Sequence, residues 1–209
     1  LDPTLMVGLP PHITSSTGMD ALTHAVEAFI GLNGSPYTDE KALEATRLIM
    51  ASLEKAYLDG SDLQARTDMA LASLYGGAAF TRAYVGYVHA IAHNMGGLYG
   101  VPHGLANAII LPHVLEFCRH DAQAKLAALA RAGGIGSPGE DEEALARAFI
   151  EQIKGMNQRM GIPTTIAQLR AEDIPLIARR ALAEAHPEYP VPTIMSLAEC
   201  EALVRGLLA

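Results

Sequence analysis

The sequence predicts an all-α domain of seven to nine helices. Apolar residues recur at helical spacing along most of the chain, and alanine-rich stretches such as residues 124–132 have high intrinsic helix propensity. The few β-branched residues, among them Val85 and Ile109, lie inside patterns that keep the helical period. With 209 residues and 50% hydrophobic content, the chain can bury the core of one compact domain, or at most two small ones.

The first predicted helix begins at Thr17, a capping residue that Asp20 follows three positions later, and it ends at Gly31. A second helix is expected over residues 38–59 and a third from residue 63 to the glycine pair at 76–77, because glycine commonly ends a helix. We expect residues 1–16, which precede this first helix, to be an interdomain linker.

Residues 17–209 are expected to form the helical domain. Its remaining helices are predicted over residues 83–95, 105–132, 141–160 and 171–185, with a last helix after Ser196. Ser196 and Glu199 have the spacing of a capping box, in which each side chain bonds the other residue's backbone N–H. Prolines in the last third mark loops and helix starts.

Charge and composition exclude several function classes. Lys plus Arg is 15 and Asp plus Glu is 23, so the formal net charge is -8, and nucleic acid or an anionic membrane surface is not the expected partner. Cys118 and Cys200 are too few for a disulfide scaffold, which favours a reducing cytoplasm. Apolar stretches fall short of the roughly 20 residues of a membrane span. The opening Leu1-Asp2-Pro3, without an initiator Met, indicates a piece of a longer protein.

Residues 134–139 match the GxGxxG pattern of dinucleotide-binding loops. That fingerprint needs a preceding strand and a following helix in a βαβ unit. Here an alanine-rich helix precedes it, Pro138 lies inside it, and the acidic run 140–143 follows and would repel a pyrophosphate. We therefore expect a turn between two helices.

Five side chains form the candidate chemical site. Asp20 and His24 are four residues apart on one predicted helix, as are His89 and His93, and His103 stands between a proline and a glycine. Nitrogen and oxygen donors without a nearby thiolate suit Fe(II) or Zn(II). The alternative is a set of hydrogen-bonded core histidines and an ordinary ion pair. Spacing alone leaves this open, and also which of His89 and His93 would be a ligand.

Two segments resemble a known family. Residues 18–29 (GMDALTHAVEAF) resemble the first signature of the iron-containing (group III) alcohol dehydrogenases, and residues 86–97 (GYVHAIAHNMGG) through 102–104 (PHG) resemble the second. Residues 105–114 (LANAIILPHV) continue the match. The resemblance covers essentially the whole chain and implies the all-α, dehydroquinate synthase-like domain of that family.

In that family one Asp and three His hold the metal. When the ligand positions of the family are transferred to the matching motifs of this chain, the resemblance implies that the ligands are Asp20, His24, His89 and His103. It also implies that His93 is the further histidine beside substrate and nicotinamide, a proton relay. The resemblance gives no such role to the remaining histidines, which are His12, His113, His120 and His186; a structural role is expected for His113, and the others are expected on the surface or in loops.

The resemblance implies a metal- and nicotinamide-dependent alcohol dehydrogenase or aldehyde reductase. Fe2+ is the expected metal, with Zn2+ or another divalent ion as the alternative. NAD(H) or NADP(H) would bind an N-terminal nucleotide-binding domain that this chain lacks, so little activity is expected from the chain alone. A small alcohol or aldehyde is the expected substrate, and a homo-oligomer the expected assembly.

Rival interpretations differ in what they require. Residues 185–193 depart from the Gly-Asn-Pro-Arg-like loop of many family members, so the resemblance does not identify the preferred alcohol. A maleylacetate reductase-type enzyme is therefore an alternative. A helical structural or interaction domain without catalytic role is the non-enzymatic alternative. A di-iron bundle would need Glu-x-x-His pairs and a zinc protease His-Glu-x-x-His, and the sequence has neither.

Overall fold

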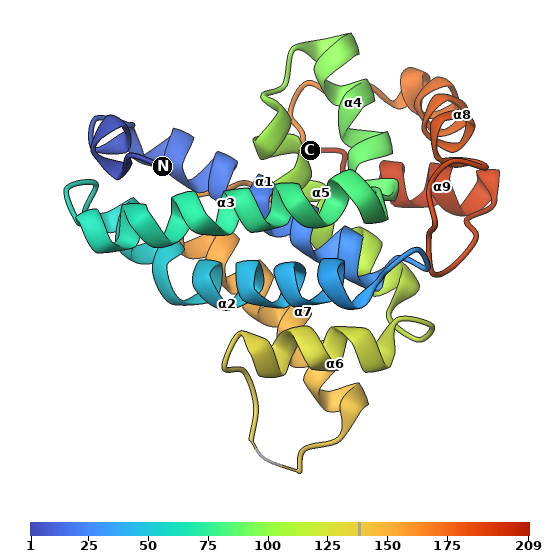
Figure 1. Cartoon of the computed structure of the whole chain (residues 1–209). Helices are drawn as coiled ribbons and strands as arrows, with labels where there is room; N and C mark the ends of the chain where they lie inside the picture. Colours follow the sequence, from blue (N-terminus) through green and yellow to red (C-terminus); the bar gives the residue numbers. More distant parts are fainter. Residues whose placement is uncertain (138) are drawn as a thin grey trace.

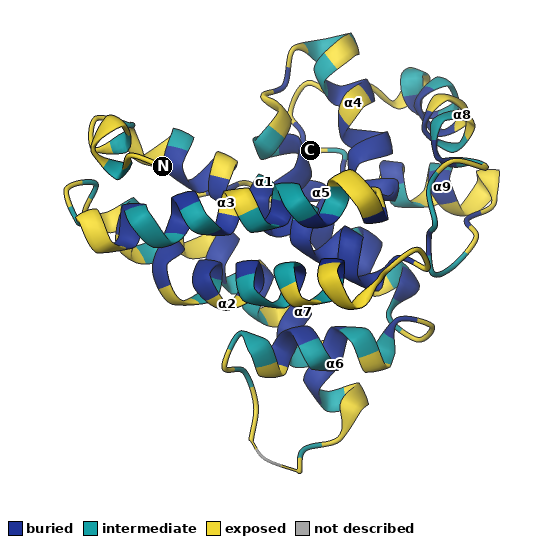
Figure 2. Cartoon of the chain, in the orientation of Figure 1, coloured by how far each residue is buried: buried dark blue, intermediate teal, exposed yellow. Residues whose placement is uncertain are grey.

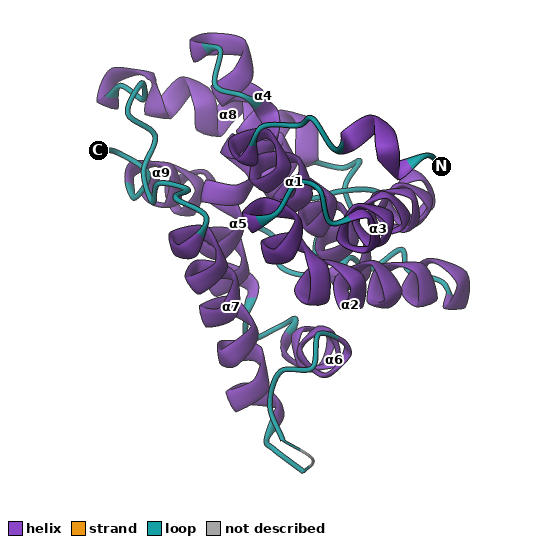
Figure 3. Cartoon of the chain, turned by 90° about the vertical axis from the view of Figure 1, so that its left-hand side faces the viewer, coloured by secondary structure: helices purple, strands orange, loops and turns teal. Residues whose placement is uncertain are grey.

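The computed structural model describes residues 1–137 and 139–209, and this described part contains helices and connecting loops but no strand (Figure 3). Nine α-helices in it confirm the predicted all-α fold. They are α1 (Pro11–Ile30), α2 (Pro36–Leu58), α3 (Leu63–Ala83), α4 (Tyr87–Tyr99), α5 (His103–Cys118), α6 (Gln123–Ala132), α7 (Glu142–Arg159), α8 (Ile174–Ala185) and α9 (Leu197–Arg205). Two short 3-10 helices, η1 (Pro3–Met6) and η2 (Ala171–Asp173), complete the set.

Helix α1 is the core of the domain. It packs against α2, α3, α5 and α6, and α4 joins the assembly through α5 and α8 (Figure 1). From Met19 to Ile30 almost every residue of α1 is buried, so this stretch is covered on all sides (Figure 2). Within this stretch, Asp20 and His24 are the two residues that stay partly exposed. Among the described helices, none is long and apolar enough to cross a bilayer.

The first helix begins earlier than predicted. Helix α1 starts at Pro11 instead of Thr17, so its first turns lie inside the segment expected to be a linker. Proline is favourable at a helix start because its fixed φ suits the helix and its missing N–H would have no partner there. Thr17 bonds back to the carbonyl of Ile13 within the helix, and Gly18 packs against Leu53 of α2. The Thr-Gly pair is thus a packing feature and not a cap.

The glycine pair predicted to end the third helix lies inside α3, which continues to Ala83. Gly76 faces α1 so closely that an added Cβ would lie 3.0 Å from the carbonyl oxygen of Ala21. The glycine therefore serves helix packing and does not terminate the helix. Helix α4 correspondingly begins at Tyr87, because Tyr84, with a φ of 68°, lies outside the helical region.

The single helix predicted over residues 105–132 is two helices, α5 and α6. The polar residues Arg119, His120 and Asp121 form a turn, and α6 then packs against α7 and α2. Periodicity continues across the turn in the sequence, which is why the break was missed. The prediction for residues 171–185 needs a smaller correction, because its first three residues form η2.

Several helix starts agree with the sequence. Ser196 and Glu199 make the predicted capping box at α9, and Asp141 caps α7. Helix α2 begins slightly before its predicted start, because Ser35 is the cap and Thr38 its capping-box partner. The GxGxxG segment lies between α6 and α7, as expected of a turn between helices; within it, Pro138 is outside the described residues.

A close contact between α1 and α5 fixes the position of the candidate site. A Cβ added at Gly104 would lie 2.4 Å from the backbone oxygen of Ser16, which no side-chain movement can relieve. We expect Gly104→Ala to lower the free energy of unfolding by at least about 2 kcal/mol, because overpacking against backbone forces the helices apart. Urea unfolding followed by circular dichroism measures this change.

Gly77→Ala is the matched control, since nothing lies within 4 Å of a Cβ added there. Its expected effect has the opposite sign, a gain of about 0.5–1 kcal/mol, because alanine favours a helix interior over glycine. Equal stability of the two variants would show that α1 and α5 do not approach each other as described.

Candidate metal centre

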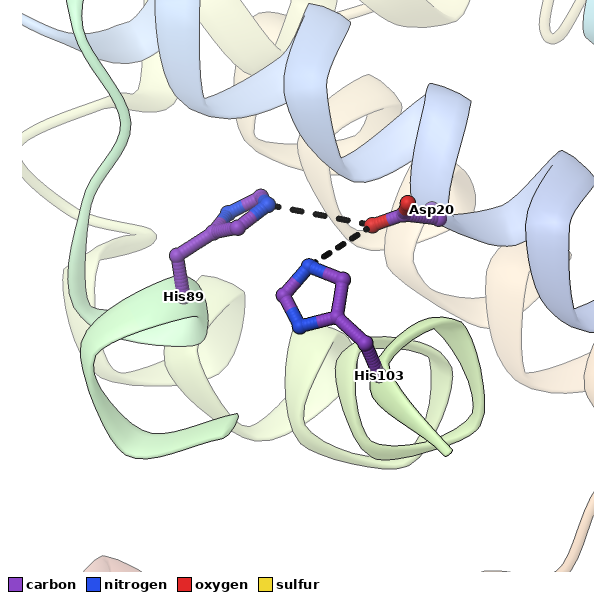
Figure 4. Close-up of side chains that lie close together, drawn as sticks. All are labelled: Asp20, His89 and His103. Carbon is purple, nitrogen blue, oxygen red and sulfur yellow. Dashed lines mark ion pairs between the residues drawn. The ribbon is translucent and has the colours of Figure 1, made fainter. Parts of the chain in front are cut away.

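Three helices bring the candidate ligands together at one point. Asp20 comes from α1, His89 from α4 and His103 is the first residue of α5 (Figure 4). His24 lies on α1, one turn after Asp20. The Oδ1 atom of Asp20 lies 3.4 Å from Nε2 of His103, 3.7 Å from Nε2 of His89 and 4.0 Å from Nε2 of His24. One donor atom each from Asp20, His89 and His103 lies within 4.8 Å of the others. The Nε2 atom of His24, which the resemblance also implies as a ligand, is the most distant of the three nitrogens, and His24 is not part of this group of three.

Stacked rings hold the imidazoles in place. The ring of His24 lies between Phe80, with centroids 4.3 Å apart, and His89, with centroids 4.7 Å apart, and both pairs are nearly parallel. His103 lies 5.3 Å from the ring of His89 and stacks on His93 at 5.4 Å. Packing on two faces restricts ring rotation, so the Nε2 atoms keep their directions.

Glu27 positions His89 and was missed by the sequence analysis. Its buried carboxylate accepts a hydrogen bond from Nδ1 of His89 at 2.6 Å through Oε2, and one from the backbone N–H of Val88 at 2.8 Å through Oε1. Nδ1 therefore carries the proton, and the lone pair of Nε2 is directed at the site. The available signal was an acidic residue inside an apolar helix, three residues after His24.

Asn107 also contacts the candidate ligands and was missed by the sequence analysis; the available signal was its position four residues after His103 on the same helix. Its Nδ2 atom lies 2.6 Å from Oδ1 of Asp20, 3.0 Å from Nε2 of His103 and 3.2 Å from Nε2 of His89. The amide NH2 has two hydrogens, so it donates to Oδ1 of Asp20 and to at most one of the two histidine nitrogens. Within the described part of the chain, the buried Oδ1 of Asn107 has no hydrogen-bond partner.

Burial controls the protonation of the imidazoles. Desolvation lowers the pKa of His24 to about 4, against a smaller opposing effect of Asp20. Desolvation likewise lowers the pKa of His103. For His89, burial acts to lower the pKa, but the hydrogen bond and charge of Glu27 outweigh it and raise the pKa. His24 and His103 are therefore neutral near pH 7, the state in which imidazole binds a cation.

His93 lies at the edge of the group. Its side chain is 45% exposed, its ring stacks on His103, and its Nδ1 is 2.7 Å from Oε1 of Glu184 in α8. The structure thus brings His93 beside the donors without including it in the convergent set around Asp20. His93 thus lies at the exposed edge of the group, whereas Nε2 of the buried His89 is directed at Asp20.

The other histidines lie away from the convergent set. His12 and His120 are exposed, and His113 lines a groove between α5, α7 and α9. His186 follows α8 and has its Nε2 2.6 Å from the hydroxyl of Tyr87. None of the four belongs to the described group of donors around Asp20.

The fold and the donors define a candidate metal centre inside an all-helical domain. The sequence model of one protein family, described as "Fe-containing alcohol dehydrogenase family, C-terminal", matches residues 14–207. The chain belongs to this family, as the C-terminal domain of its members, which confirms the resemblance seen in the sequence.

Individual relatives agree with this assignment. The chain is 44% identical over 187 residues to 1,3-propanediol dehydrogenase of Klebsiella pneumoniae, covering 88% of the chain and 48% of that protein. It is 36% identical over 210 residues to NAD-dependent methanol dehydrogenase of Bacillus methanolicus, covering 100% of the chain and 55% of that protein. A solved structure of 1,3-propanediol oxidoreductase matches with a TM-score of 0.93 and 42% identity, over 98% of this chain and 54% of the other. The chain spans about half the length of these relatives.

The lowered pKa of His24 predicts how stability of the metal-free chain depends on pH. Between about pH 7 and pH 5 the unfolded chain protonates His24 while the native site keeps it neutral, so unfolding takes up a proton and native stability falls with falling pH. The expected loss through this residue is about 2 kcal/mol, from a native pKa near 4 and an ordinary value near 6.5.

Urea unfolding at both pH values, with a chelator present, compares the wild type with His24→Gln. The variant should lose less stability than the wild type over this range, because its residue 24 does not titrate. An equal loss in both proteins would mean that His24 is not held neutral by burial.

Proposed function

We propose that this chain holds the catalytic metal of a nicotinamide-dependent alcohol dehydrogenase or aldehyde reductase, with Asp20, His24, His89 and His103 as ligands. The observation that carries the proposal is the convergence of three Nε2 atoms on Oδ1 of Asp20. Membership of the Fe-containing family supports it. Relatives named for propanediol and methanol favour a small alcohol or aldehyde as substrate.

The residues fit a divalent ion chemically. Neutral imidazoles and one carboxylate suit Fe2+, which the family's name favours, and they equally suit Zn2+, which binds more tightly at most such sites. Asp20 supplies one negative charge beside the ion, and Glu27 supplies a second behind His89. A carboxylate behind a histidine ligand raises its basicity and fixes its orientation.

The positions of the ion and of the surrounding side chains assign each a separate role in the reaction. A bound divalent ion supplies Lewis acidity, which favours loss of a proton from the alcohol oxygen and so release of hydride from carbon. His93, exposed and one helical turn after His89, is the proposed proton acceptor. Phe80 stacks on His24 and covers one face of its ring.

Hydride transfer needs a cofactor held beside this site. We propose that NAD(H) or NADP(H) is held by an N-terminal α/β domain outside this chain, and that the chain alone transfers little or no hydride. Residues 1–16 would lead into that domain. The segment 134–139, which matches a dinucleotide loop in letters, connects two helices instead of following a strand.

The assembly and location complete the proposal. Large apolar side chains exposed near the start of the chain, Leu1 and Leu5, favour contacts with another domain or a second copy in a homo-oligomer. The buried free thiols Cys118 and Cys200 favour a reducing cytoplasm.

The first test is the metal content of the chain. After anaerobic loading with Fe(II) and desalting, we expect about one ion per chain by elemental analysis, the stoichiometry of a single site. His103→Ala should retain little metal, because it removes one of the converging nitrogens.

His120→Ala is the matched control, since this exposed side chain is remote from the site, and it should bind as the wild type does. Full retention of metal by both His103→Ala and Asp20→Asn would overturn the ligand assignment and favour a structural domain.

A second test addresses the carboxylate behind His89. We expect Glu27→Gln to weaken Zn2+ binding about 10- to 100-fold, because mutation of a residue that orients a metal ligand typically has this effect. Competition with a coloured chelator measures the affinity. Glu188→Gln, an exposed change in charge, should leave it unchanged; equal affinities of the two variants would argue against the role given to Glu27.

A further inference from the structure

We propose that Glu184 and Tyr189 are positioning residues for His93, holding its proton on Nδ1 and leaving the lone pair on Nε2. The inference rests on the proposed function, in which His93 accepts a proton from the substrate side. It assigns a role in the chemistry to α8 and to the loop that follows it, neither of which contributes a candidate metal ligand.

The geometry is a three-residue chain of hydrogen bonds. Oε1 of Glu184 lies 2.7 Å from Nδ1 of His93, and the hydroxyl of Tyr189 donates to the same oxygen at 2.8 Å. The carboxylate is an acceptor and cannot donate, so the nitrogen that faces it must carry the proton. A neutral His93 then has Nε2 as its only free acceptor, which is the form a proton relay requires.

Tyr189 is held in place by the loop that carries it. The backbone N–H of Leu32 donates to the carbonyl of Pro190 at 2.7 Å, which ties the loop to the end of α1. The N–H of Met195 donates to the hydroxyl of Tyr87 at 2.8 Å, which ties it to the start of α4. The loop therefore holds Tyr189 in fixed relation to α1 and α4, the helices that carry Asp20, His24, His89 and His93.

Tyr189 is suited to act as a permanent donor. Burial and the hydrogen bond to Glu184 raise its pKa well above the ordinary value, so the hydroxyl stays protonated at any pH where the protein works. Its donated bond fixes one oxygen of Glu184 toward His93. Because the Glu184 side chain is 32% exposed and that of His93 is 45% exposed, water screens their attraction, and the contribution of the pair is orientation more than stability.

The Glu184–His93 pair resembles the Glu27–His89 pair in geometry but differs from it in exposure to solvent. Both carboxylates meet Nδ1 of a histidine on α4, at 2.6 Å for His89 and 2.7 Å for His93. The His89 side chain is 4% exposed and its Nε2 is directed at Asp20. His93 lies at the solvent edge, where a proton can leave. In both pairs a carboxylate at Nδ1 leaves the lone pair on Nε2. We propose that this lone pair binds a cation in His89 and accepts a proton in His93.

The test reads the protonated ring nitrogen directly. We expect long-range 1H–15N NMR spectra of the wild-type chain at about pH 8, above the ordinary imidazole pKa, to show His93 as the Nδ1–H tautomer. Glu184→Met keeps the length of the side chain and removes the acceptor, so His93 should change to mostly Nε2–H. Glu184→Gln retains an acceptor oxygen and should restore Nδ1–H, which a role in helix packing alone would not require.

Controls separate this inference from the proposed function. Glu188→Gln, in the same loop and exposed, should leave the tautomer unchanged, and Zn2+ affinity should stay within about threefold in both Glu184 variants, because His93 is not a ligand. An Nε2–H tautomer in the wild type, or an unchanged tautomer in Glu184→Met, would overturn the inference. Failure of the wild type to bind Zn2+ would overturn the proposed function while the tautomer result stands by itself.

Discussion

The buried pair of Glu27 and His89 is the interaction on which the site depends. Among the described residues, Glu27 is the only acidic side chain that is buried, and burying a charge is costly unless it is paired and hydrogen-bonded. Both of its oxygens have partners, and both partners belong to α4. A Cβ added at Gly86 would lie 2.8 Å from Oε1, so the absence of a side chain there lets α4 begin close enough to α1. The pair thus fixes the position of α4, and with it those of His89 and His93.

Helix α1 has two functions that usually conflict. It is the core helix of the domain, and it also carries the polar groups Asp20, His24 and Glu27 on one side. Asp20 is satisfied by Asn107 of α5 and Glu27 by His89 of α4, whereas the ring of His24 stacks between Phe80 of α3 and His89. Polar groups in an interior are stable only when such partners are in place. The packing of α4 and α5 against α1 therefore also brings the side chains of the site together.

The sequence predicted the fold class and singled out the candidate ligands because their signals are local. Asp20 and His24, four residues apart on a helix, share a face in any folded state, and the capping box at Ser196 involves residues three apart. Helix ends were less predictable. Gly18 and Gly76 look like breaks in a sequence, and only the neighbouring helix shows that they serve packing. Glu27 and Glu184 could not be assigned because their histidine partners are far away in the sequence.

The positions of the site residues on α1 limit which insertions and deletions this helix can accept. Asp20, His24 and Glu27 occupy one helix, so inserting a single residue before Asp20 would rotate all three by about 100° relative to the preceding turns. The helix is covered by α2, α3, α5 and α6, so no neighbouring surface is free to follow the rotation. A point substitution changes one of these side chains and leaves the others in place, whereas a change in length displaces all three at once. In the connection between α6 and α7, most of the described residues (133–137 and 139–141) are exposed, and variation in the length of a surface loop has no such consequence.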